Sequence, residues 1–92
     1  MKLEELREQL DQIDQELVSL FEQRRELCRQ VAHYKIEVNK PVLDATREAS
    51  KIETLRKMAK DCKEADAIEA LFHHILSDSR QLQKEIMEMH QA

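Results

Sequence analysis

Apolar residues recur at alternating steps of three and four along the first part of the chain. The series is Leu3, Leu6, Leu10, Ile13, Leu17, Leu20, Arg24, Leu27, Val31, Tyr34 and Val38. This spacing is that of the a and d positions on one face of a helix, so it predicts a helix over residues 3–38 with a continuous apolar seam. Pro41 ends that helix, because the residue before a proline avoids helical backbone angles.

Two further helices are predicted in the rest of the chain. Asp44 is a candidate N-cap for a helix over 45–61, whose apolar face carries Ile52, Leu55 and Ala59. The polar stretch KDCKEAD predicts a turn, and an apolar stripe that includes Leu76 then predicts a helix over 66–90. The expected fold class is therefore all-α, with three helices in one domain over residues 1–92.

The length of the first helix predicts an oligomer. A helix over 3–38 is roughly 54 Å long at 1.5 Å per residue, whereas a compact domain of this size is only about 30 Å across. The helix must overhang its own domain, and its seam stays apolar along the overhang. Another copy of the chain is the simplest cover, so we expect an intertwined two-fold homodimer.

Composition and charge exclude several function classes. The chain has 92 residues and contains no glycine, which excludes a GxGxxG dinucleotide loop and a P-loop. A net charge of -4 and only three aromatic residues argue against nucleic acid as a partner. No apolar run is long enough for a membrane span, and the opening MKLEELREQL is too charged for a signal peptide. Cys28 and Cys62 are therefore expected to be reduced thiols of a cytoplasmic protein.

Arg24 interrupts the apolar seam of the first helix, and it is not alone. Lys35 follows eleven residues later, which returns it to nearly the same side of a helix. The line Arg24, Cys28, Val31 and Lys35 thus carries two cations about 16 Å apart. Both side chains are long enough to lean towards one small ligand between them.

Polar residues also interrupt the apolar faces of the other two helices. Ser79 and Gln83 share a face with Leu76, and Glu48 lies in line with Ile52, next to Arg47. A buried polar group without a partner costs about 1–3 kcal/mol. Two explanations remain open on this pattern: a polar cavity for an anionic ligand, and an internal ion-pair network such as Arg24 with Glu48.

No catalytic nucleophile with its base is apparent in the sequence. The histidines form neither an HExxH motif nor a triad, and we interpret them as surface residues; they are His33, His73, His74 and His90. Any chemistry is expected to need neither covalent catalysis nor a metal.

Three stretches resemble a known family over essentially the whole chain. They are LREQLDQIDQELVSLFEQRRELCRQVAHYK, PVLDATRE and DSRQLQ, in this order. The chain is similar to the all-helical, AroQ-class chorismate mutases, which are intertwined three-helix dimers. Their reaction is the Claisen rearrangement of chorismate to prephenate, a pericyclic step without a cofactor.

The resemblance implies a role for each matching residue. It implies that Arg24 and Arg47 bind the carboxylates of the dianionic substrate, that Arg7 of the opposite protomer joins them, and that Ser79 assists. It implies that Lys35 and Gln83 donate to the ether oxygen, and that Glu48 and the backbone at Asp44 hold the ring hydroxyl. The implied catalytic residues are Lys35, Gln83, Arg24 and Glu48. Arg80 departs from the family, which often has an apolar residue there, and is expected to alter affinity.

Three alternatives to a mutase stay open at this point. An isochorismate-pyruvate lyase has the same fold and a similar pericyclic site. A non-catalytic helical dimer is the second, although the matching charged residues argue against it. A nucleic-acid-binding coiled coil is the third; it would use Arg24, Arg25, Arg29 and Lys35, and the negative net charge argues against it.

Overall fold

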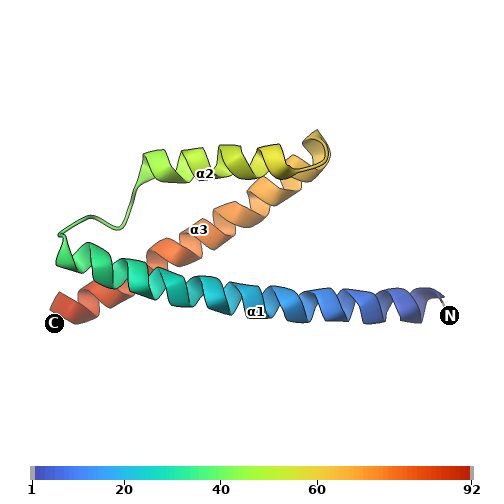
Figure 1. The fold of residues 1–92 in the computed structure, drawn as a ribbon, viewed down its shortest axis with the longest axis horizontal. Helices are drawn as coiled ribbons and strands as arrows, with labels where there is room; N and C mark the ends of the chain where they lie inside the picture. The colour runs from blue at the N-terminus through green and yellow to red at the C-terminus, as the bar shows by residue number, and fades with distance from the viewer. Residues whose placement is uncertain (1, 92) are drawn as a thin grey trace.

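Three helices make up the structure, a computed structural model that describes residues 2–91. They are α1 (Lys2–Glu37), α2 (Ala45–Met58) and α3 (Cys62–Gln91), and no strand occurs in the described range (Figure 1). The prediction of an all-α chain with three helices is confirmed. Met1 and Ala92, the two ends of the predicted domain, lie outside the described residues. None of the three helices is long and apolar enough to cross a membrane.

The end of α1 is a turn that usually requires glycine. Asn39 has a positive φ of 57°, in the left-handed region. The N–H of Lys40 donates to the carbonyl of Lys35 at 2.8 Å, and the N–H of Asn39 donates to the carbonyl of Ile36 at 3.3 Å. These are the two bonds of a Schellman motif. Asparagine takes the left-handed position, which it tolerates better than most residues, in a chain without glycine.

The turn between α2 and α3 is shorter than the sequence pattern predicts. α2 ends at Met58 instead of residue 61, and α3 begins at Cys62 instead of residue 66. Asp61 explains the early start, because its carboxylate accepts a hydrogen bond from the backbone N–H of Glu64 at 2.8 Å. This is the bond of an N-cap. Five of the seven residues of KDCKEAD therefore belong to the first turns of α3, and the predicted turn is present but lies at residues 59–61.

α3 holds the other two helices together. α1 packs on α3 and α2 packs on α3, whereas α1 and α2 make no close backbone contact within residues 2–91. In Figure 1, α3 runs diagonally from the C-terminal end of α1 towards the far end of α2. The apolar residues buried by this packing are few and mostly small; they are Cys28, Ala32, Ala65, Leu76 and Leu82.

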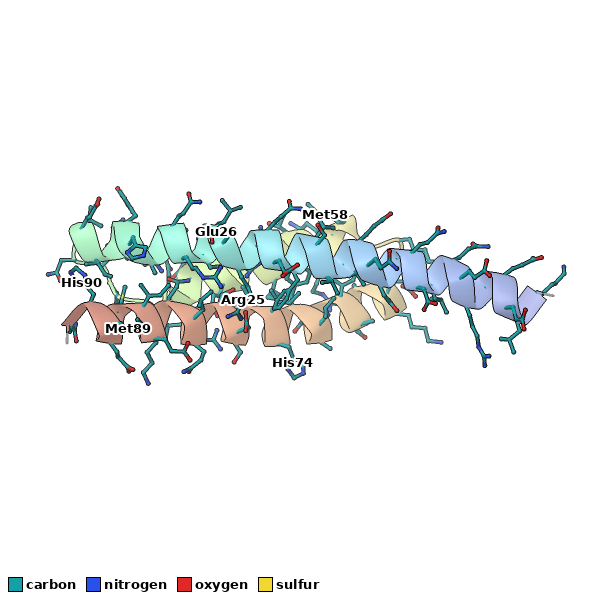
Figure 2. The ribbon with its side chains drawn as sticks, turned by 90° about the horizontal axis from the view of Figure 1, so that it is seen from below. Arg25, Glu26, Met58, His74, Met89 and His90 are labelled. Atoms are coloured by element: carbon teal, nitrogen blue, oxygen red, sulfur yellow. The ribbon has the colours of Figure 1, made fainter. Side chains whose placement is uncertain are left out.

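The predicted seam of α1 does not face α3. The six seam residues from Leu3 to Leu20 are 53–59% exposed, and Leu27 and Tyr34 are exposed as well. The face that packs on α3 is the adjacent one, which carries Cys28 and Ala32. The N-terminal end of α1 extends beyond the other helices (Figures 1 and 2), and the longest dimension of the chain is 56 Å. Most of the seam is thus exposed in the single chain.

A charged cluster clamps α2 to α3 near their connecting turn. Arg56 on α2 pairs with Asp66 at 3.0 Å and with Glu69 at 2.9 Å, and His73 contacts Glu69 at 3.0 Å. The hydrogen bond with His73 and that with Arg56 lower the pKa of the Glu69 carboxyl below its ordinary value of 4.5. The hydrogen bonds to Asp66 and Glu69 raise the pKa of Arg56. The cluster therefore favours the charged form of both partners.

Glu69→Gln should lower the melting temperature slightly at pH 7, and the difference should shrink as the pH falls. The pKa of Glu69 is lower in the folded than in the unfolded state, so its contribution is complete above the unfolded pKa and is lost as the pH falls through the folded one. Melting curves by circular dichroism, from pH 7 down to the lowest pH at which the protein folds, measure this.

Glu53→Gln is the matched control, because Glu53 pairs only with Lys57 of the same helix, at 3.8 Å. It should change the melting temperature less than Glu69→Gln, since exposed pairs of this kind contribute little. A Glu69→Gln effect that stays constant across the pH range would contradict the clamp.

Candidate active site

A cavity of about 220 Å³ lies where α1 and α2 stand apart over α3. All three helices and the segment between α1 and α2 contribute to its wall. The lining residues are Arg24, Cys28, Val31, Lys35, Val42, Asp44, Arg47, Glu48, Lys51, Leu76, Ser79 and Gln83.

Seven of the eight residues predicted from the sequence line this one cavity. They come from positions as far apart in the chain as Arg24 and Gln83. Arg7 is the exception: it lies on the exposed N-terminal half of α1 and is absent from the lining. In one chain, therefore, the structure brings together every predicted site residue except the one expected from the opposite protomer.

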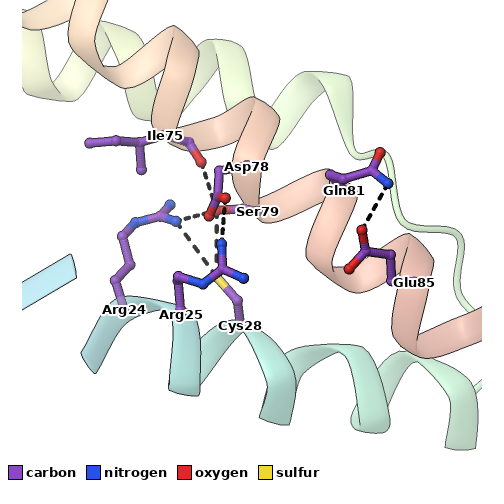
Figure 3. Close-up of polar contacts among 8 residues, drawn as sticks. All are labelled: Arg24, Arg25, Cys28, Ile75, Asp78, Ser79, Gln81 and Glu85. Carbon is purple, nitrogen blue, oxygen red and sulfur yellow. Dashed lines mark hydrogen bonds and ion pairs between the residues drawn. The ribbon is translucent and has the colours of Figure 1, made fainter. Parts of the chain in front are cut away.

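α1 supplies one line of side chains, in the order Arg24, Cys28, Val31 and Lys35. The guanidinium of Arg24 donates to the hydroxyl of Ser79 and to the sulfur of Cys28, the latter at 3.6 Å (Figure 3). The hydroxyl of Ser79 in turn donates to the carbonyl of Ile75 at 3.0 Å. Arg24 is thus held by neutral groups on both helices.

Within residues 2–91 no carboxylate pairs with Arg24. The ion pair between Arg24 and Glu48, the alternative drawn from the sequence, is not formed among the described residues. Glu48 pairs instead with Arg80, from α3. The next residue after Arg24 behaves differently, because Arg25 points from α1 towards α3 and pairs with Asp78 (Figures 2 and 3). Of these two neighbouring arginines, Arg25 forms an ion pair and Arg24 lines the cavity.

Lys35 ties the loop after α1 to the cavity wall. Its ammonium group donates to the backbone carbonyl of Val42 at 2.8 Å. A lysine ammonium has three donors, so this bond fixes the head group and leaves donors for a ligand. The same loop carries Asp44, so Lys35 also positions the start of α2.

The first turns of α2 present charged groups to the cavity. Asp44 is the N-cap, as predicted, and its carboxylate accepts from the N–H of Arg47 at 3.0 Å. Lys51 also lines the cavity and was missed by the sequence analysis. A signal for it exists, since Lys51 lies four residues after Arg47 and three after Glu48, which is the same side of a helix.

Gln83 is a buried polar side chain, and its amide oxygen has no hydrogen-bond partner within residues 2–91. The residue is only 7% exposed, and the atom without a partner is Oε1. A buried amide without partners costs about 1–3 kcal/mol. A ligand group that donates a hydrogen bond to this oxygen would remove that penalty.

The charges on the cavity wall favour an anion. Four cations and two carboxylates line it, a formal excess of two positive charges. The cations are Arg24, Lys35, Arg47 and Lys51, and none of them forms a salt bridge within the described part of the chain. Unpaired cations around a small enclosed volume attract a ligand of opposite charge more strongly than cations on an open surface.

The cavity holds no histidine, and the four histidines of the chain are exposed. In the range 2–91 no group of three or more His, Cys, Asp or Glu side chains has an arrangement that could hold a metal ion. Cys28 is a buried free thiol within the wall, and Cys62 is an exposed one. What the wall offers a ligand is four cations, two carboxylates and neutral hydrogen-bonding groups.

The chain is similar in sequence to known proteins. The family model described as chorismate mutase type II matches residues 6–84. A chorismate mutase of Methanocaldococcus jannaschii is 31% identical over 91 residues, which cover 95% of this chain and 89% of that protein. No solved structure matched the chain.

Larger relatives match as well. A bifunctional chorismate mutase/prephenate dehydratase of Escherichia coli (strain K12) is 34% identical over 86 residues, and so is one of Shigella flexneri. These residues cover 92% of this chain but only 22% of each bifunctional protein. The family match spans most of the chain and includes every residue that lines the cavity, from Arg24 to Gln83. This chain therefore belongs to the chorismate mutase type II family.

Proposed function

We propose that the chain catalyses the rearrangement of chorismate to prephenate in the cavity between its three helices. The observation that carries the proposal is the formal excess of two positive charges on the cavity wall, since chorismate is a dianion. The family match supports the same reaction. An assay of chorismate disappearance in the ultraviolet, with identification of the product as prephenate, tests it. Release of pyruvate from isochorismate, without prephenate from chorismate, would indicate a lyase instead.

The reaction needs donors at one oxygen atom. As the carbon–oxygen bond of the ether breaks, negative charge builds on that oxygen. Lys35 and Gln83 line the cavity, and in the proposed complex both donate to this oxygen. Donors aimed at a developing charge stabilise the transition state more than the ground state. The buried position of Gln83 strengthens such a bond, because little water competes for it.

The other residues of the wall bind and fold the substrate. In the proposed complex Arg24 and Arg47 bind its carboxylates, and Ser79, which already accepts from Arg24, assists them. Glu48 and the backbone at Asp44 hold the ring hydroxyl. Lys51 adds a fourth cation on the same face of α2 as Arg47. Holding a flexible dianion in its reactive conformer removes much of the entropic part of the barrier.

The proposal includes a homodimer built on the seam of α1. The accessible surface of the chain is 7539 Å², whereas a compact monomer of this mass exposes about 5,600 Å². The excess is larger than the roughly 800 Å² that each partner buries in a standard interface. The radius of gyration, 16.6 Å, also exceeds the value of about 12 Å for a compact domain. A second copy would cover the exposed leucines of the seam.

Arg7 completes the site in this dimer. It lies seventeen residues before Arg24, which is about 25 Å along a helix and about 100° around it. The two residues cannot grip one small dianion from a single straight helix. In an antiparallel pair of α1 helices, Arg7 of one protomer approaches Arg24 of its partner. A cytoplasmic location remains a prediction from the sequence.

Arg24→Ala should lower kcat/KM at least a hundredfold and leave the fold intact. It removes a charge-assisted contact to the substrate, and no protein carboxylate loses its partner.

Arg25→Ala is the matched control. It strips the ion pair from Asp78, whose Oδ2 is already buried without a partner, so it should reduce the free energy of unfolding by about 1–2 kcal/mol while the folded enzyme keeps its activity. Chorismate assays and melting curves of both variants decide; an unfolded Arg24→Ala protein would favour a structural role.

Gln83→Glu should be active only at acidic pH. A glutamate donates a hydrogen bond only when protonated, and its ordinary pKa is about 4.3. Burial and the substrate anion should raise that pKa, so activity should return as the pH falls. Gln81→Glu is the control, because Gln81 is exposed and bonds to Glu85 at 3.1 Å on the outer side of α3 (Figure 3). Equal activity of Gln83→Glu at neutral and acidic pH would exclude donation to the ether.

Two inactive variants should restore each other when their chains mix. In a dimer of Arg7→Ala with Lys35→Ala, one site receives both intact residues and the other carries both defects. Random assortment makes half of the dimers mixed, so roughly one quarter of all sites should recover. The chains are refolded together, and mixed dimers are confirmed by mass. Arg24→Ala mixed with Lys35→Ala is the control that must recover nothing, since both residues belong to the same protomer's site; no recovery in the first mixture would overturn the shared site.

A further inference from the structure

Arg80 contacts the cavity only through another residue. It lies on α3 directly after Ser79, and its guanidinium pairs with Oε1 of Glu48 on α2. Glu48 lines the cavity, whereas Arg80 does not. The Glu48 side chain is 24% exposed and that of Arg80 is 38% exposed. Arg80 therefore holds the carboxylate from outside the cavity wall, and within residues 2–91 no partner occupies Oε2 of Glu48.

Two other cations, Arg47 and Lys51, lie close enough in sequence to compete with Arg80 for the Glu48 carboxylate. Arg47 is the preceding residue, and Lys51 lies three residues later on the same face of α2. Carboxylates and lysines at this spacing pair readily on a helix. Without Arg80, the Glu48 carboxylate would turn to one of these cations and neutralise it. One positive charge that is available to an anionic ligand would then be lost.

We propose that Arg80 is a positioning residue that keeps Glu48 out of ion pairs with the cations of the cavity. By binding Oε1 it leaves Oε2 free to accept a hydrogen bond from a hydroxyl of the ligand. It also offsets the negative charge of Glu48 from outside the wall, so that all four cations of the wall stay unpaired. This inference rests on the proposed function for its kinetic test, although the position of Glu48 can be measured without activity.

Arg80→Met removes the charge and keeps the length of the side chain. It should raise KM for chorismate about three- to tenfold, the range expected for loss of a part-exposed charge-assisted contact. Arg80→Lys should recover part of that loss. Arg56→Met is the matched control, because Arg56 also joins α2 to α3 but pairs with Asp66 and Glu69 away from the cavity. It should lower the melting temperature and leave KM unchanged.

A double-mutant comparison separates positioning from long-range charge. In a Glu48→Gln background, Arg80→Met should have no further effect on kcat/KM, because the carboxylate it holds is gone. The same loss in both backgrounds would show that Arg80 acts as a distant charge, and the inference would fail. An unchanged KM in Arg80→Met would overturn it as well.

A crystal structure of Arg80→Met gives a readout that needs no activity. The Glu48 carboxylate should lie within salt-bridge distance of Lys51 or Arg47. A carboxylate that stays in place would contradict the inference whatever the enzyme does. If the unchanged protein fails to convert chorismate but Glu48 turns in the variant, the proposed function fails and the positioning role stands for another anion.

Discussion

The close packing of α1 on α3 through small side chains is the constraint on which the site depends. Cys28, Ala32 and Ser79 are buried at this contact, and the sulfur of Cys28 lies 3.5 Å from the hydroxyl of Ser79. Small residues let two helix backbones approach, so that long side chains beside them reach the opposite helix. Arg24 and Arg25 do so, towards Ser79 and Asp78. A bulkier residue at 28 or 32 would separate the helices and move Arg24 away from the rest of the cavity wall.

The same contact shows how the chain distributes its charges. Arg25 has a carboxylate partner and contributes to the structure, whereas Arg24, one residue earlier, has only neutral partners and faces the cavity. Collecting unpaired cations in one cavity raises their mutual repulsion, and an anion that binds there relieves it. Any ligand that binds the folded state alone also stabilises it by mass action. Binding and folding are therefore linked at this site through electrostatics.

Sequence patterns predict some of these features and miss others for identifiable reasons. The periodic seam predicts α1 closely, because steps of three and four over many turns permit only one kind of element. Arg24, Lys35 and Gln83 stand out because each is polar on an apolar face. The roles of Arg7, Asp44 and Arg47 came from the family resemblance, since the pattern alone marks Asp44 only as a helix N-cap and assigns no ligand to any of the three.

The features that were missed depend on relations between helices or on single capping bonds. Lys51 was overlooked because a lysine three residues after a glutamate is ordinary on a helix surface. The pairing of Arg80 with Glu48 depends on how α2 is rotated relative to α3, which no pattern within one helix specifies. The start of α3 was placed too late because the polar composition of KDCKEAD concealed the cap at Asp61.

In the proposed dimer, one helix performs two tasks that the chain cannot separate. The buried residues of a single chain are few and small, so most of the stabilising apolar burial would come from the seam of α1 against its partner. The same N-terminal half of α1 carries Arg7. The partner that supplies the missing apolar contacts thus also supplies the missing cation, and a chain that dissociates loses both together. Selection for a complete site therefore acts as selection for the interface, because the free energy of association keeps Arg7 at the cavity.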